Sequence, residues 1–181
     1  QALDSDQVGY LTTPQISSLN TDTLNRLSGD QIAAFSTAQV KSLTSEQLNS
    51  LTSGLLQSLT QSQIEKLTTV QVSKLSTEQF NYLSADQIGY LTTAQAKSLT
   101  TTQISNLSAD AFAALTSAQL GALTTAQINK LTTTHLAALS ANQAEGLKSQ
   151  QIRSMTTDLL SAISADGVTL IQTKALKYLS A

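Results

Sequence analysis

The sequence predicts an all-α fold, an α-solenoid or superhelix of about 22 very short helices with one helix in each eight-residue repeat. Three observations predict it: a large apolar residue recurs every eight positions, a helix N-cap residue follows it, and Gln stands three positions after the N-cap. The octad LTTTQISN at residues 99–106 shows all three features. A fixed period of this kind indicates a repeat architecture in which neighbouring repeats bury one another's apolar face.

Two apolar columns form the expected core. One steps by eight from Leu3 to Leu179 and is apolar throughout, and the other runs from Val8 to Leu176 with only two alanines. A continuous helix would turn by about 800° per octad, so its apolar stripe would wind around the rod and no partner helix could follow it. A β-solenoid remains the alternative, although the odd spacing of five would place the two columns on opposite faces of a strand.

The start of each expected helix is marked by side chains that accept hydrogen bonds. The residue after each core Leu is Ser, Thr, Asp or Asn from residue 4 to residue 164, with Lys148 as the exception, and Ser/Thr-x-x-Gln is a capping box. Nine of the twelve acidic residues lie two places after the N-cap, and eight of the ten basic residues lie in the two places before the core Leu. This sorting follows the helix dipole and indicates that every octad begins and ends its own helix.

The organisation of the chain follows from the unbroken period. We expect residues 1–181 to form a single octapeptide-repeat solenoid, elongated and cut from a longer array, because no octad is inserted or interrupted. The octads of residues 156–181 are atypical, with Leu159, Gly167 and Ala175 in the Gln position. They are interpreted either as a C-terminal cap or as ordinary decay of the repeat.

Composition removes several function classes. The net charge of −2 gives no electrostatic reason to expect nucleic-acid binding. The absence of Cys excludes thiolate catalysis and thiolate metal sites. No apolar run is long enough for membrane insertion. No phosphate-binding, dinucleotide-binding or metalloprotease motif is present, so we expect no enzyme, no cofactor and no metal. The one histidine, His135, replaces a capping Gln, and we expect it to take over the hydrogen bonds of that Gln.

A candidate ligand-contact stripe lies immediately before the core Leu. Lys66, Lys74, Tyr82 and Tyr90 occupy this position in four successive octads. Such a stripe would suit a glycan or a peptide. The alternative is that these side chains cover the edge of the core with their stems and keep their polar tips in water.

The octads LTTAQAKS, LTTTQISN and LTTAQINK resemble the Leu-Thr-Thr-x-Gln-Ile/Val-x-x arrays of large bacterial surface and secreted proteins, which are often labelled adhesin-like, RTX-like or "heme utilization". The resemblance covers essentially the full chain and departs from the pattern at Leu55, at Ala111 and in the last three octads. It implies an extracellular or cell-surface location and a non-catalytic rod that spaces or presents adhesive parts. The alternative function is a ligand-binding solenoid that holds a peptide, a glycan or a small hydrophobic molecule in its groove.

Overall fold

The computed structural model describes residues 4–163 and residue 169, and within this part of the chain it is entirely helical. Twenty helices of four to six residues replace the expected "about 22", because the last octads lie outside the described residues. The all-α prediction is confirmed, and the β-solenoid alternative is wrong for the described residues, which contain no strand. The chain divides into two compact units, residues 1–91 and 92–181. Each unit is described by itself.

Eleven helices belong to the first unit. They are α1 (Ser5–Gly9), α2 (Thr13–Ser18), α3 (Thr21–Leu24), α4 (Gly29–Ala33), α5 (Thr37–Ser42), α6 (Ser45–Ser50), α7 (Ser53–Gln57), α8 (Gln61–Lys66), α9 (Thr69–Lys74), α10 (Thr77–Tyr82) and α11 (Ala85–Tyr90). The described part of the second unit holds α12 (Thr93–Ser98), α13 (Thr101–Ser105), α14 (Ala109–Ala113), α15 (Ser117–Ala122), α16 (Thr125–Ile128), α17 (Thr133–Ala137), α18 (Ala141–Glu145), α19 (Ser149–Ser154) and α20 (Thr157–Ser161).

Every described helix begins directly after the predicted N-cap residue. At α12 the Thr92 hydroxyl accepts a hydrogen bond from the Gln95 backbone N–H (3.2 Å), and Gln95 Oε1 accepts one from the Thr92 N–H (2.6 Å). Nineteen of the twenty N-caps accept such a side-chain bond, and Lys148 does not. The capping device therefore restarts a helix every eight residues, as the sequence predicts.

Each helix ends as the chain enters the next core Leu. Leu43 shows the pattern: its backbone is extended (φ −59°, ψ 132°), and its N–H donates to the Val40 carbonyl at 3.2 Å. No described residue has a positive φ. The corner between two helices is thus made by ordinary L-residues, which explains why the repeat needs no glycine there.

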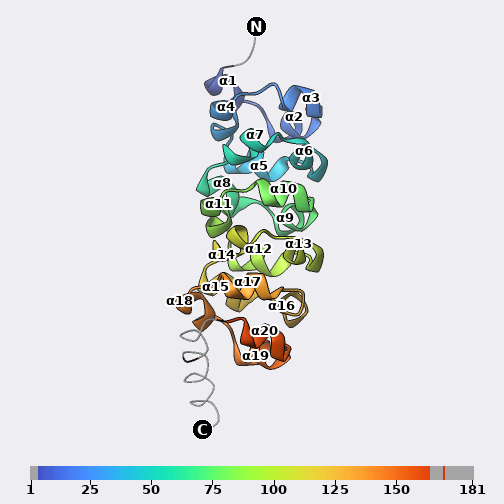
Figure 1. The fold of residues 1–181 in the computed structure, drawn as a ribbon. Helices are drawn as coiled ribbons and strands as arrows, with labels where there is room; N and C mark the ends of the chain where they lie inside the picture. The colour runs from blue at the N-terminus through green and yellow to red at the C-terminus, as the bar shows by residue number, and fades with distance from the viewer. Residues whose placement is uncertain (1–3, 164–168, 170–181) are drawn as a thin grey trace. The chain divides into compact units, whose positions relative to one another are not determined.

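Helices three octads apart stack on one another, so three octads make one turn of each solenoid. In the first unit α2, α5, α8 and α11 form one column, and in the second unit α12, α15 and α18 do so. Figure 1 shows successive turns stacked within each unit. The Ile/Val column points inward and is almost completely buried, and the Leu column is buried from Phe35 to Leu147, so side chains fill the interior.

The capping Gln has a second partner that the sequence did not reveal. While Gln63 Oε1 accepts from the Thr60 N–H (2.8 Å), its Nε2 donates to the carbonyls of Ile32 (2.9 Å) and Phe35 (2.7 Å) in the turn before. Donation from Nε2 across 28 to 31 residues recurs at eight further glutamines, namely Gln39, Gln47, Gln71, Gln79, Gln87, Gln127, Gln143 and Gln151. We call this series of bonds the Gln ladder. It gives a donor to the carbonyl of the core Leu or Phe 28 residues earlier, and a second donor to the carbonyl 31 residues earlier, which already accepts a backbone N–H as Ile32 does from Phe35 (3.2 Å).

In two octads of the first unit, an Asn from the preceding turn replaces the Gln as the acceptor for the N-cap N–H. Leu55 stands in the Gln position of one octad and has no side-chain acceptor, so the Thr52 N–H donates to Asn25 Oδ1 at 3.1 Å. At α10 the expected capping box of Gln79 is wrong: Asn49 Oδ1 accepts the Ser76 N–H at 2.7 Å, which leaves the buried Gln79 Oε1 without a partner.

Candidate functional site

The predicted ligand-contact stripe is distributed over different columns of the solenoid. Lys66, Lys74, Tyr82 and Tyr90 are the last residues of α8, α9, α10 and α11, with the lysines exposed and the tyrosines half-buried. Of these four helices, α8 stacks on α11, whereas α9 stacks on α6 and α10 on α7. The turn of three octads thus brings Lys66 and Tyr90 onto neighbouring helices of one column, and places Lys74 and Tyr82 on the other two.

Tyr82 makes a hydrogen bond of its own within α10. Its hydroxyl donates to Glu78 Oε1 at 2.6 Å, one helical turn earlier. This hydrogen bond, and then the charge of the carboxylate, raises the pKa of Tyr82. The phenol is therefore engaged with a neighbour on its own helix.

His135 takes the structural place of a Gln, as predicted. Its Nδ1 accepts from the Thr132 N–H (3.1 Å), and its Nε2 lies 2.9 Å from the Leu107 carbonyl, which requires a hydrogen on Nε2. The ring is buried, and its centroid lies 5.1 Å from that of Phe112. Both nitrogens bind backbone, so the imidazole is unavailable as the general base of a Ser-His-Asp triad.

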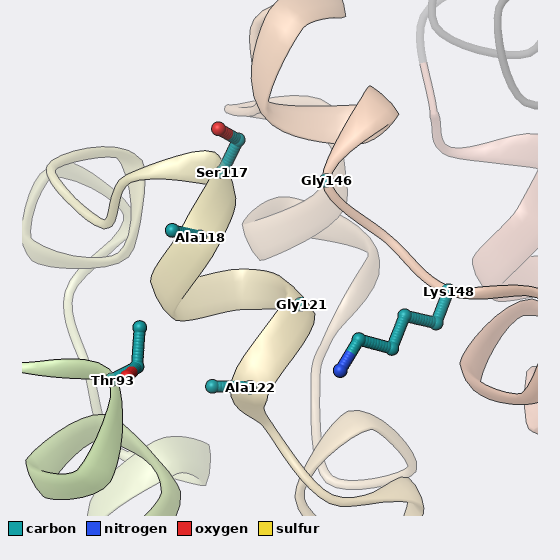
Figure 2. A pocket seen from close by; sticks show the side chains of 7 residues that line it. All are labelled: Thr93, Ser117, Ala118, Gly121, Ala122, Gly146 and Lys148. Atoms are coloured by element: carbon teal, nitrogen blue, oxygen red, sulfur yellow. The ribbon is translucent and has the colours of Figure 1, made fainter.

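A surface hollow lies beside α15 in the second unit. It has a volume of about 430 Å³, and Figure 2 shows the seven residues that line it: Thr93, Ser117, Ala118, Gly121, Ala122, Gly146 and Lys148. A second hollow of about 320 Å³ shares Gly121, Ala122 and Lys148 and adds Lys97. We call the two together the α15 hollow.

Two glycines create the close packing beside the α15 hollow. A Cβ atom on Gly121 would lie 2.7 Å from the Gly146 carbonyl oxygen, and a Cβ atom on Gly146 would overlap the Ser117 carbonyl. The backbones at α15 and at the end of α18 therefore touch directly. The surface left open next to this contact is formed by small side chains and backbone.

Two lysines supply the charge of the α15 hollow. Lys148 occupies the N-cap position of α19, and Figure 2 shows its side chain extended toward α15, with the ammonium nitrogen facing the helix near Ala122. Lys97 lines the second hollow from α12. No acidic residue lines either hollow. The arrangement can attract an anion and offer it charged and hydroxyl donors.

Sequence reasoning missed this site, although the signals are visible in the repeat. Lys148 is the only residue without a capping side chain in the N-cap column between residues 4 and 163, and Gly146 is the only glycine directly before a core Leu in the same range. Each of these two departures alone resembles ordinary decay of the repeat. Both residues lie against α15 only because three octads make one turn, and the sequence did not reveal that number.

The described residues contain neither a candidate metal centre nor a membrane-spanning helix. No group of three or more His, Asp or Glu side chains there is arranged to hold a metal ion. The described helices are too short and too polar to cross a bilayer.

Comparison with known proteins identifies the repeat. No curated protein and no solved structure gives a significant match to the chain. The family model of the ALTTAQ repeat matches residues 24–61 and 56–93, so this part of the chain is similar to an ALTTAQ repeat array, in agreement with the octapeptide period.

Proposed function

We propose that the chain is a non-catalytic structural module, a rod that spaces or presents adhesive parts of a bacterial surface or secreted protein. The observation that carries this proposal is the Gln ladder. The recurrent polar residues of the octad, which would otherwise be candidates for binding or catalysis, are used to cap helices and to join turns. The similarity to ALTTAQ repeats supports a repeat module. The extracellular setting is part of the proposal, and the resemblance of the octads to surface arrays supports it.

A spacer must keep its ends apart under load, and the ladder is suited to that task. Each ladder Gln except Gln79 binds one turn through Oε1 and the preceding turn through Nε2. Separation of two turns would break several of these hydrogen bonds at once, and each contributes about 0.5–1.5 kcal/mol relative to the same groups bonded to water. Within each unit we therefore expect turns to separate cooperatively.

Surface display provides the test. The chain would be placed between a bacterial outer-surface anchor and a small reporter domain, and a flexible Gly/Ser linker of equal length would serve as the control. We expect the folded chain to expose the reporter to a bulky probe through a capsule better than the flexible linker does. Equal exposure with the two connectors would contradict the spacer function.

The ligand-binding alternative is favoured by one observation, the α15 hollow. It combines two lysines with the close contact between the backbones at Gly121 and Gly146. A spacer and a ligand site are compatible in one chain, and they are tested by different measurements.

A further inference from the structure

We propose that the α15 hollow is a binding site for a small anion that carries a carboxylate and several hydroxyl groups, a hexuronate in chemical class. The hexuronate would be either a free sugar acid or a unit of an acidic polysaccharide. This site is independent of the spacer function.

The first argument is the convergence of departures from the repeat. Gly121, Gly146 and Lys148 meet at one place in the second unit, and Lys148 gives up the N-cap bond that every other described octad makes. The octad thus loses local stability without any gain within α19. Places where a chain breaks its own local rule are candidates for function.

The second argument is charge. Lys148 lines both parts of the hollow, Lys97 lines one of them, and no carboxylate of the protein lines either. Glu145 is adjacent in sequence to Gly146 but is absent from the lining. Two ammonium groups without an acidic neighbour in the lining favour a carboxylate, which accepts charge-assisted hydrogen bonds from an ammonium group.

The third argument is the shape and the remaining polar groups. Ala122, which carries only a methyl group, forms an open part of the wall beside the contact between Gly121 and Gly146, so the puckered ring of a sugar can approach the helix there. Hydroxyl and amide side chains surround this wall, from Thr93, Ser117 and Gln150. They provide donors and acceptors for sugar hydroxyls, and the volume of about 430 Å³ lies in the range of small-ligand sites.

The test is an NMR titration of the ¹⁵N-labelled full chain with sodium glucuronate at constant ionic strength, with glucose as the neutral probe. We expect saturable shifts of the Gly121, Gly146 and Lys148 amides with glucuronate and none with glucose. Lys148→Ser should weaken glucuronate binding about tenfold or more, because it removes a charged donor. Lys97→Gln should weaken binding to a smaller degree.

The control variant is Lys130→Gln, which removes an exposed lysine that does not line the hollow. It should bind glucuronate as the wild type does. Lys148→Ser should also remain folded, with an unfolding midpoint at or above the wild-type value, so that lost binding cannot be attributed to unfolding. An oligogalacturonate that binds more tightly than the monomer would assign the ligand to a polysaccharide, and one that binds no more tightly would assign it to the free sugar acid.

The proposal is overturned by any of three results. They are the absence of saturable shifts with glucuronate, equal shifts with glucose, and unchanged binding in Lys148→Ser.

Discussion

Single amide side chains determine how successive turns are joined. Apart from Gln79, a ladder Gln uses its oxygen for the N-cap of its own helix and its nitrogen for carbonyls 28 and 31 residues earlier, as Gln151 does with Leu123 (2.7 Å) and Leu120 (2.9 Å). His135 performs both tasks with its two ring nitrogens. The identity of the residue matters less than having one acceptor and one donor at the right separation.

Replacement of His135 by Gln tests this equivalence. Gln can restore both backbone bonds and loses only the ring contact with Phe112, so the free energy of unfolding should change by no more than about 1 kcal/mol. His135→Leu leaves the Thr132 N–H and the Leu107 carbonyl without partners and should cost about 2 kcal/mol or more. Urea unfolding followed by far-UV circular dichroism gives both values, and equal losses would contradict the hydrogen-bond role.

Lys148→Ser is expected to stabilise the protein. Ser restores the missing side-chain acceptor at the start of α19, and an N-cap of this kind contributes about 1 kcal/mol. The same urea titration measures the gain. A matched change at a regular N-cap, Thr124→Ala, should lower stability by about the same amount. A loss of stability in Lys148→Ser would show that the lysine has a structural role.

The octad is the element of this fold, and most of its anatomy is predictable. The N-caps, the two core columns and the charge distribution of each helix follow from local chemistry, so the positions of the twenty described helices agree with the sequence-based expectation. The exceptions are octads that depend on another turn. Asn25 serves the octad of Leu55 from 30 residues away, and the sequence places an Asn at the same distance before Ala111 and Leu159. The replacement of a capping Gln by an Asn from another turn can be recognised in the sequence only when the number of octads per turn is known.

A double-mutant cycle tests the pairing of Asn25 with the Leu55 octad. Asn25→Ala removes the acceptor for the Thr52 N–H and the donor to the Ser50 carbonyl (2.8 Å), so it should cost about 1–2 kcal/mol. In a Leu55→Gln background the new Gln can cap Thr52, and the loss should shrink by about 1 kcal/mol.

The matched control for this cycle is Asn142→Ala, which changes an exposed Asn on α18 and should have almost no effect. If Asn25→Ala lowers the free energy of unfolding by the same amount in the wild-type chain and in the Leu55→Gln background, the two positions act independently and the proposed pairing is wrong.

At the scale of the whole molecule, each unit is a stack in which a helix contacts the helices three places before and after it. The sequence predicted the solenoid but left open the number of octads per turn. That number depends on the extended backbone at each core Leu and on the reach of the Gln side chain. For the same reason the four candidate residues from Lys66 to Tyr90, which are neighbours in the period, are distributed over three columns. Stability should thus depend on contacts between turns more than on any single helix.

Gln63→Leu tests the contribution of the ladder. It leaves the Thr60 N–H and the Phe35 carbonyl without their hydrogen bonds in a buried place, and it removes the second donor to the Ile32 carbonyl, which still accepts from the Phe35 N–H (3.2 Å). We expect a loss of about 3 kcal/mol. Gln15→Leu is the control, because Gln15 is exposed and its Oε1 caps Thr12 (2.8 Å), while its Nε2 makes no ladder bond within the described residues. It should cost about 1 kcal/mol. Equal losses in the two variants would contradict a stabilising role for the ladder.

The fixed reach of the Gln ladder also constrains how such a gene can change length. Because each ladder Gln finds its acceptors by counting back the same 28 to 31 residues, duplication or deletion of one octad leaves it with equivalent partners and advances the stack by a third of a turn. An octad that depends on a distant Asn lacks this freedom. A duplication between Asn25 and Leu55 would separate the two and leave the Thr52 N–H without its acceptor. Unequal recombination is therefore tolerated between regular repeats and disfavoured across this pair.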